Sequence, residues 1–565
     1  MRTSTKSVVS ALVVGVVPCL GLLAPRGLAA DPADLARPLL DPVPPPLPSV
    51  FETKGQRPKS DPSVLPPAQT KLEPSLQHLP APSTLGLPNK IGEVKIDGLR
   101  PLSLEEVENL AEVNNPNLKA IGSQVDQAQS NLRARLAAWY PTLALTANGF
   151  PSYTGGQQEQ IDANPNTAAD GQINTFTNRW AMTGSLTAQW DVINPQRVPE
   201  ITAARDQFEQ SKNQYLIALR ELRLQVAQAY FQLQRSDDRV RIGQTSVQAS
   251  LVSLRDARAR FQAGVATKLE VLEAETQLGR DQQLLSDSLA NQSTSRRDLA
   301  RLLDLPQNLT PTAKEPLRPL GVWLPSLQES IIGAYSFREE LDNAVLDISV
   351  ANSQANSALG NVQPFMSIVN TLLGTQYSGV EAILVDLPGT RGYAVENTVG
   401  LNFRLNLFDG GASRAQYRQF KQRADQQKFN FAKIRDDIRF EVERTFFDLT
   451  SSQRNIQTTS REVLSSRESL RLARLRFQAG VTTQREVVDN QRDLTQAELR
   501  YSDSLWQYNN SLAELRRRTG LDQIAICSPT DLSAVRPLED ETYSVPVPPE
   551  PLPPACKAAY PSAAG

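Results

Sequence analysis

The stretch SLRDARARFQAGV at residues 253–265 returns almost unchanged as SLRLARLRFQAGV at residues 469–481. Extending both copies by six residues gives nineteen aligned positions, of which fourteen are identical without a gap. The same 216-residue offset aligns VAQAYFQL, from Val226, with VERTFFDL, from Val442. A repeat of this length indicates two copies of one supersecondary unit rather than a short-period solenoid.

Each quoted stretch ends a long segment of helical character. Residues 201–305 and 412–528 contain no proline and are rich in Ala, Leu, Gln, Arg and Glu, which favour helix. Apolar residues recur at three-then-four spacing, a coiled-coil-like seam, at Leu254, Ala257 and Phe261 and at Leu470, Ala473 and Phe477. A helix from Glu200 to Gly264 would be about 100 Å long. A glycine can end such a helix, so a second helix to about Leu303 should return antiparallel.

Each copy also contains segments in which apolar and polar residues alternate with period two. RWAMTGSLTAQW sets the apolar residues from Trp180 to Trp190 on one face, and VGLNFRLNLF does so from Val399 onward. PTLALTANGF alternates more weakly, and QPFMSIVNTLL only suggests a strand. We expect strands of about ten residues, the length that a membrane β-strand needs, at about 141–150, 179–193, 363–374 and 395–409.

The strand ends and the connections also resemble those of a membrane sheet. Two bands of aromatic residues resemble the girdles of outer-membrane barrels: Tyr140, Trp190 and Phe408 at one end, and Phe150, Tyr153, Trp180 and Tyr393 at the other. Residues 152–175 and roughly 376–392 are long polar or Gly-rich connections, as expected of loops outside the cell. A sandwich would need a second sheet, and only four strands are expected.

Four lipid-exposed strands cannot close a barrel alone. Each unpaired backbone N–H or C=O in lipid costs several kcal/mol, and barrels of this kind begin at about eight strands. Subunits must therefore share one barrel. Two copies would give about eight strands and three about twelve, and only the larger barrel leaves room for a wide pore.

The composition excludes several classes of function. The 565-residue chain has a net charge of −2, so no basic surface indicates nucleic acid. Its single histidine, His78, lies in a Pro-rich segment. GxSxG, P-loop and Rossmann motifs are missing from the sequence. We therefore expect a protein that is not an enzyme and that uses no cofactor and no metal.

The first thirty residues have the pattern of a secretory signal peptide. Arg2 and Lys6 precede an apolar core at residues 8–23, and Ala30 ends a cleavage-site pattern. A membrane anchor is a poorer reading, because sixteen residues with Pro18 make a poor span. A lipoprotein at Cys19 is disfavoured, because that cysteine lies inside the apolar run.

Proline-rich segments border the expected folded part. Residues 31–90 contain fifteen prolines, so residues 31–96 are expected to form a disordered extension. Residues 531–565 are expected to form a similar tail. Cys527 and Cys556 remain once the signal is removed, and an exported chain permits one disulfide between them. Two free thiols are the alternative.

Further features resemble the TolC-like outer-membrane efflux proteins. LSLEEVENLAEVNNPNL from Leu102, QSNLRARLAAWYPTLALTA from Gln129 and above all the doubled RFQAGV…EV carry the resemblance. It covers about residues 102–524, and the order of elements with the duplication makes it specific. On this basis we expect one efflux repeat at 97–310, with its hairpin tip at Gly264, and a second at 311–530, with its tip at Gly480.

The resemblance implies an α+β membrane protein in the outer membrane that spans into the periplasm. Three copies would share a twelve-stranded β-barrel, continued by a long α-helical coiled-coil barrel. Such a homotrimer is the exit duct of a tripartite efflux pump or a type I secretion system. Its partners would be a periplasmic adaptor protein, an inner-membrane transporter of the RND or ABC type, and outer-membrane lipid, with no nucleic acid.

The resemblance also assigns roles to residues. The adaptor would dock on the two tips, at Arg260, Phe261, Gly264 and Val265 and at Arg476, Phe477, Gly480 and Val481. Carboxylates past each turn would narrow the closed tunnel as a periplasmic gate, at Glu270, Glu486 and Asp489. The family member with the best-known gate has a basic residue two positions after the second glycine, where this chain has Thr482, with Arg485 nearby. The ion pairs that close the gate therefore need not be the same.

The alternating strands assign the polar faces to the water-filled lumen, at Thr183, Thr187, Gln189, Asn402, Arg404 and Asn406. The two copies differ just after the glycine, with Lys268 and Leu269 against Gln484 and Arg485, so the two tips need not contribute equally. A periplasmic adaptor and a structural coiled-coil protein are the alternatives. The sequence does not name the substrate, the adaptor or the transporter, and it gives no role for the Pro-rich extension.

Overall fold

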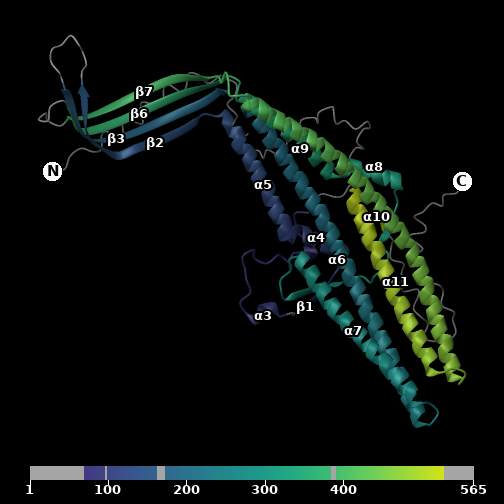
Figure 1. The fold of residues 1–565 in the computed structure, drawn as a ribbon. Coiled ribbons are helices and arrows are strands. Elements are labelled where there is room, and N and C mark those ends of the chain that lie inside the picture. The colour runs from purple at the N-terminus through teal and green to yellow at the C-terminus, as the bar shows by residue number, and fades with distance from the viewer. Residues whose placement is uncertain (1–68, 96–97, 162–171, 383–389, 523, 527–565) are drawn as a thin grey trace. The chain divides into compact units, whose positions relative to one another are not determined.

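The computed structural model describes residues 69–95, 98–161, 172–382, 390–522 and 524–526. Long helices and a four-stranded antiparallel sheet make up most of this part (Figure 1). The expected order of helix, two strands, long helix and returning helix occurs in both halves. The first set is α5 (Pro116–Leu136), β2 (Thr142–Ile161), β3 (Gln172–Ile193), α6 (Arg197–Gln262) and α7 (Lys268–Leu302). The second set is α9 (Glu339–Gly360), β6 (Phe365–Ala382), β7 (Thr390–Arg404), α10 (Ala412–Gln478) and α11 (Gln484–Thr519).

Shorter elements lie beside the middle of the long helices. They are η2 (Pro74–Leu76), α3 (Ile91–Val94), β1 (Gly98–Leu102), α4 (Leu104–Asn114), β4 (Leu309–Ala313), β5 (Gly321–Trp323), α8 (Leu327–Phe337) and β8 (Ile524–Ile526), whereas η3 (Ala137–Trp139) joins α5 to β2 at the sheet. β1 pairs with β4 in parallel, and β5 pairs with β8 antiparallel. These strands of three to five residues are too short for a periodic signal in the sequence.

The four long strands exceed the ten residues that the sequence indicates. They contain 20, 22, 18 and 15 residues. Part of what we expected to be loop belongs to the ladder: β2 and β3 pair from Tyr153–Trp180 out to Ile161–Gln172. Ladder hydrogen bonds need no apolar face, and the alternation that reveals a strand is present only where one face is apolar. Sequence periodicity therefore located the apolar part of each strand and missed its polar continuation.

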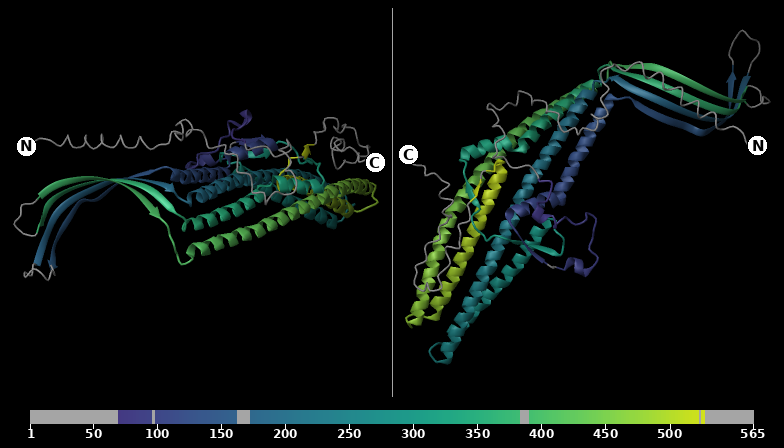
Figure 2. Two further views of the ribbon diagram at one scale, coloured as in Figure 1. Left: turned by 90° about the horizontal axis from the view of Figure 1, so that it is seen from above. Right: turned by 180° about the vertical axis from the view of Figure 1, so that it is seen from behind.

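The helices follow the same lateral order as the strands. The sheet order is β2–β3–β6–β7. Along the helices, α5 packs on α6, α6 on α9, and α9 on α10. Toward the hairpin tips, the order becomes α7–α6–α11–α10 (Figures 1 and 2). The outermost elements of one chain are therefore β2, α5 and α7 on one side, and β7 and α10 on the other.

α6 and α10 have 66 and 67 residues and are each about 100 Å long. Each buries an apolar patch in the middle of its length. Val226 and Val442, which are 216 residues apart, are both fully buried in their clusters. The expected antiparallel hairpins are confirmed, because α7 packs on α6 and α11 packs on α10.

Buried ion pairs tie three helices together at this level. Arg220 of α6 contacts Glu339 of α9 at 2.7 Å, and Arg517 of α11 contacts Glu340 at 2.9 Å. Burial acts to raise the pKa of Glu340, but hydrogen bonds and charges from Arg338 and Arg517 outweigh it and lower that pKa to about 2. Removing one partner of such a buried pair typically costs about 3–5 kcal/mol. This network fixes the helix order at the level where α9 ends and α11 takes its place beside α6.

The expected disorder of residues 31–96 is wrong for its final part. Leu76 and Leu79 are 1% and 2% exposed and pack into the α6 core. The amide of Gln69 donates to Glu112 at 2.7 Å, and the Asn114 side chain donates to the carbonyl of Leu79 at 3.1 Å. Proline prevents helix and sheet but not this kind of side-chain anchoring. Residues 1–68, with the expected signal peptide and most of the extension, and the tail at 531–565 lie outside the described residues.

The two returning helices end in the same left-handed turn with different residues. Asp304, after α7, has φ 47°, and Gly520, after α11, has φ 69°. These positions are again 216 residues apart. A Cβ on Gly520 would lie 2.8 Å from Nη1 of Arg220 and 3.1 Å from the carbonyl oxygen of Phe337. Glycine is therefore required at the second position by packing as well as by backbone conformation.

We expect Gly520→Ala to lower the free energy of unfolding by about 2 kcal/mol or more, because it adds left-handed strain and a steric clash. Asp304→Gly is the matched control. Relief of strain there is offset by the greater entropy of the unfolded chain, so we expect a change of less than about 1 kcal/mol. Apparent melting temperatures in detergent, at one scan rate, measure both. Equal stability of Gly520→Ala and the wild-type chain would contradict this account.

Candidate functional site

β3 and β7 place polar residues on one face of the four-stranded sheet and apolar residues on the other, whereas β6 mixes the two kinds. Thr187 of β3 lies opposite Thr371 of β6, which lies opposite Thr398 of β7. By the same register, the predicted lumen residues of both halves lie on one face, namely Thr183, Thr187, Gln189, Asn402 and Arg404. Thr146 and Ser185 share a hydrogen bond on this face, and Arg404 stacks over Phe365 at 5.2 Å. The sequence thus assigned these five side chains to one common surface.

Asn406 is the exception, because β7 ends at Arg404. The Asn406 side chain donates to the carbonyl of Asn361 at 2.9 Å, which links the start of α10 to the end of α9. The prediction that Asn406 is a strand residue is therefore wrong. The alternation continues through Asn406 in the sequence because the connecting segment also alternates, although it has no strand partner in the described residues.

The opposite face is apolar and open to the surroundings. Leu143, Leu145, Val399, Leu401 and Phe403 are 65–78% exposed. Aromatic residues border this face, with Tyr153 against Trp180 at one level and Trp190 donating to the Trp139 carbonyl at the other. Ten residues separate Trp180 from Trp190, which is about 33 Å along a strand. Tilted as barrel strands are, this span covers about 25 Å, the height of a membrane apolar band.

Both lateral edges of this sheet are available. In the part of the chain that the structure describes, β2 pairs only with β3, and β7 pairs only with β6. Each outer edge therefore presents backbone donors and acceptors to whatever lies beside it. An apolar exposed face combined with two such edges is the geometry of an incomplete barrel wall.

The two quoted repeats form the tips of the helical hairpins. Gly264 and Gly480 have φ 74° and 73°, and a Cβ on either would contact nothing within 4 Å. At each tip, the valine amide donates back to an arginine carbonyl, from Val265 to Arg260 and from Val481 to Arg476. Together with the glycine amide bond three residues back, this is a Schellman helix end. Backbone conformation alone therefore requires these glycines.

Corresponding side chains make different contacts at the two tips. Arg476 stays on its own hairpin and contacts Glu486 at 2.8 Å, and Thr482 also donates to Glu486. Arg260 instead crosses to the other hairpin and lies over the Phe477 ring at 4.2 Å. Glu270 consequently pairs with Thr267, in a capping box at the start of α7. The difference between the copies that the sequence shows is thus accompanied by a difference in bonding.

Each predicted gate acid has a partner within its own chain. Glu270 caps α7, and Glu486 binds Arg476. Asp489 lies 3.9 Å from Arg485 and 3.4 Å from Arg492. The structure therefore brings Glu486, Asp489 and Arg485 together at the second tip and leaves Glu270 on the first. All four residues thus make structural contacts within one chain.

Sequence reasoning missed the contacts between the two hairpins. Besides Arg260 and Phe477, the buried Gln484 side chain donates to Ser253 of α6. Farther from the tips, Arg235 and Arg239 hold Asp503 of α11 at 2.7 and 3.0 Å, and Ser246 and Thr495 share a hydrogen bond at 3.2 Å. The one available signal was Gln484 itself, which replaces the Lys268 of the first copy.

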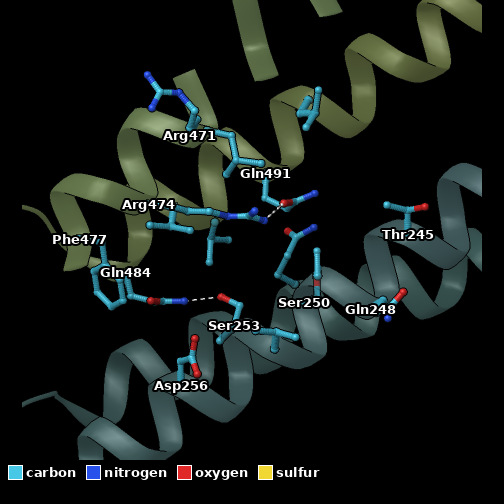
Figure 3. Close-up of a pocket in the computed structure, with 18 of the residues that line it drawn as sticks. Thr245, Gln248, Ser250, Ser253, Asp256, Arg471, Arg474, Phe477, Gln484 and Gln491 are labelled. Atoms are coloured by element: carbon cyan, nitrogen blue, oxygen red, sulfur yellow. Dashed lines mark hydrogen bonds between the residues drawn. The ribbon is translucent and has the colours of Figure 1, made fainter. Parts of the chain in front are cut away.

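A groove of about 1190 Å³ lies between the hairpins above this contact. Figure 3 shows Gln484 directed to Ser253 on the other hairpin, and Arg474 directed to Gln491 of its own hairpin, at 3.0 Å. Its lining is mainly polar, from α6, α7, α10 and α11. The Oε1 atoms of the buried Gln277 and Gln484 have no hydrogen-bond partner in the described residues. The hairpins are therefore separable surfaces joined by a few polar contacts, and not one continuous apolar core.

The remaining points concern the predicted disulfide, metal sites and membrane-spanning helices. Cys527 and Cys556 lie outside the described residues. In the described ranges, no three His, Cys, Asp or Glu side chains gather where they could hold a metal ion. None of the helices described is long and apolar enough to cross a membrane.

Comparison with known proteins agrees with this geometry. The family model described as "Outer membrane efflux protein" matches residues 107–304 and 334–521, about two thirds of the chain. The chain is 23% identical over 417 residues to the outer membrane protein TolC of Salmonella enteritidis, covering 70% of this chain and 78% of that protein. It is 22% identical over 387 residues to Protein CyaE of Bordetella pertussis, covering 68% and 77%.

Solved structures share the fold. The outer membrane protein VceC of Vibrio cholerae superposes with a TM-score of 0.58 at 16% identity, covering 74% of this chain and 96% of that one. The chain therefore belongs to the outer membrane efflux protein family: it is a TolC-like channel of the outer membrane that spans into the periplasm, and not an enzyme.

Proposed function

We propose that three copies of this chain form the passive exit duct of a tripartite efflux pump or a type I secretion system. The observation that carries the proposal is the amphipathic sheet with two edges that lack a strand partner. In lipid, those edges must find partners, because each unsatisfied backbone group costs several kcal/mol. Pairing β7 of one copy with β2 of the next satisfies both edges with the same contact, repeated around a ring.

The polar face then lines the lumen and the apolar face contacts lipid. Three copies give twelve strands, whereas two give eight, which side chains nearly fill. Thr183, Thr187, Gln189, Asn402 and Arg404 would line a water-filled passage. The internal duplication supports a ring in which each copy supplies two similar halves of the wall.

The long hairpins would continue this wall into the periplasm. Because the helix order matches the strand order, closing the barrel also brings α10 of one copy beside α5 and α7 of the next. The helices would then enclose a tunnel of about 100 Å. An inner-membrane transporter of the RND or ABC type would supply the energy.

The hairpin tips are the proposed docking surface for a periplasmic adaptor. Phe261, Val265 and Val481 are 46–69% exposed at the tips, with Arg260 and Arg476 beside them. Exposed apolar side chains beside cations are typical of a contact surface. Gly264 and Gly480 would hold this surface in shape, and Phe477 would join its two halves.

The proposed gate lies at the second tip. Glu486, Asp489 and Arg485 form intrachain contacts in this structure, and three copies would bring such carboxylates toward one axis. Rings of carboxylates favour cations and repel one another. Glu270 would contribute less, because its carboxylate caps α7. Two alternatives, a periplasmic adaptor and a structural coiled-coil protein, account for neither the exposed sheet nor the family match.

A strain that lacks this chain tests the duct directly. We expect a fluorescent dye to accumulate, or a secreted protein to remain in the cell, because the only step removed is passage through the outer membrane. Measuring both separates efflux from secretion. The wild-type gene should restore export, and a periplasmic marker enzyme should stay inside in every strain. Unchanged export of both the dye and the secreted protein would contradict the proposed function.

The Arg260–Phe477 contact should hold the two tips of one chain together. Spin labels at Val265 and Val481, in a chain with its native cysteines replaced and diluted with unlabelled copies, report the distance between the tips. We expect Arg260→Ala to broaden the distance distribution and shift it to longer values, because a cation–π contact contributes about 0.5–2 kcal/mol.

Arg258→Ala is the matched control, since Arg258 contacts Glu275 within the first hairpin only, at 3.4 Å. That variant should leave the distribution unchanged. Adding Phe477→Ala to Arg260→Ala should have little further effect, because both changes remove the same contact. A distribution that Arg260→Ala does not alter would show that other contacts hold the tips.

A further inference from the structure

An exposed apolar stripe lies along α10. Phe429, Phe440 and Phe447 are 77%, 64% and 60% exposed. Their spacings of eleven and seven residues place them on one face of an α-helix, within about 20° of one another. That face is opposite to the buried Ile438 and Val442, which pack in the chain's own core. We call these three residues the phenylalanine stripe. It points away from every other element of its own chain in the described part.

A second exposed apolar surface precedes α4. Leu85, Leu87 and Ile91 are 94%, 89% and 88% exposed, and Leu99 of β1 is 61% exposed. We call these four residues the leucine strip. It lies before residue 107, where the family match begins. Exposed apolar side chains that gather in one part of a surface often mark an interaction site.

The two surfaces lie on opposite sides of one chain. β1 pairs with β4, and β4 packs on α7 and α6. α10 is separated from these helices by α11, in the order α7–α6–α11–α10. Figures 1 and 2 show α3 and β1 beside α7, away from α10, from both directions. One chain therefore cannot bring its own leucine strip against its own phenylalanine stripe.

The two surfaces also lie at the same height. The Tyr230 hydroxyl of α6 donates to the Leu102 carbonyl of β1 at 3.1 Å. Tyr230 lies thirty-two residues before the end of α6, and the same count back from the end of α10 reaches Phe446. The ends of the two helices meet where Arg260 lies over Phe477. β1 is therefore level with the part of α10 between Phe440 and Phe447.

Opposite charges lie beside the two surfaces, and each surface also carries the other sign: Glu93 is exposed beside the leucine strip, and Lys433 and Arg444 are exposed on the stripe's side of α10. Lys90 and Lys95 are exposed near the leucine strip, and neither has an ion pair among the described residues. Asp436 and Asp437 are exposed near Phe440, and Asp436 contacts only its neighbour Arg435, at 2.9 Å. Opposite charges of this kind align two surfaces and exclude wrong partners.

We propose that the leucine strip of one copy covers the phenylalanine stripe of the next, with Lys90 and Lys95 facing Asp436 and Asp437. This contact rests on the proposed shared barrel, because pairing β7 with the next β2 brings these two sides together. It joins different surfaces of the two copies, so it closes only when the ring closes. It supplies an attachment between copies at the middle of the helices, and one side of it, the leucine strip, comes from residues that the family match does not include.

A photo-crosslinking residue in place of Phe447 tests the contact in the full chain. p-Benzoylphenylalanine keeps the aromatic ring at an exposed position, so folding should be preserved. Irradiation of the assembled protein should give a two-chain product, in which mass spectrometry locates the bond at residues 83–100 of the second copy. Arg439, about a quarter turn away and paired with Glu443 at 2.8 Å, is the control position. The same photo-crosslinking residue at Arg439 should give no such bond.

Charge reversal provides a second test, with the yield of the Phe447 crosslink as the measurement. Lys90→Glu with Lys95→Glu should reduce the Phe447 crosslink at least about fivefold, and adding Asp436→Lys with Asp437→Lys should restore it. Crosslinks within one chain, to another protein, or to other residues would overturn the proposal.

Light scattering on the same samples separates this contact from the duct. A closed ring without the crosslink would overturn this contact alone. A chain that forms no closed assembly would overturn the shared barrel as well.

Discussion

An unpaired strand edge in hydrocarbon is the constraint on which this structure depends. The sheet carries an exposed apolar surface that includes Leu143, Val399 and Phe403, and it has four strands in the described residues. Water can satisfy the edge of an ordinary sheet, but the interior of a membrane cannot. In the proposed duct, a chain with this sheet is complete only as part of a ring, and every element joined to the sheet shares the symmetry of that ring.

The helices continue the arrangement of the sheet toward the periplasm. They keep the lateral order of the strands, so the edge that needs a partner in the membrane is continued by α5, α7 and α10. Along the middle of the chain, buried pairs such as Arg220–Glu339 fix this order. Toward the tips, the hairpins are joined by fewer contacts, among them Gln484–Ser253 and Arg260–Phe477. Buried apolar packing is thus more extensive near the middle than at the tips.

The sequence predicted most of the fold because two of its signals are local. Helix ends follow from Gly264 and Gly480, whose positive φ needs no partner. Strand faces follow from alternation, which placed Thr187 and Asn402 on one surface. What could not be predicted depends on contacts distant in sequence. The anchoring of Leu76 in the α6 core and the crossing of Arg260 to Phe477 have no periodic signal. The prediction for Asn406 was wrong because the alternation of apolar and polar residues continues beyond the end of β7.

Pairing of the two sheet edges between copies is the central claim, and disulfide trapping measures it directly. The chain would carry one cysteine at Thr146 of β2 and a second at Glu396, Thr398, Gly400 or Asn402 of β7, with Cys527 and Cys556 replaced by serine. The two strands cannot meet within one chain, because β3 and β6 lie between them. At the position that lies opposite Thr146, oxidation should link copies into a covalent series that stops at three. Monomer alone at all four positions would contradict the shared barrel.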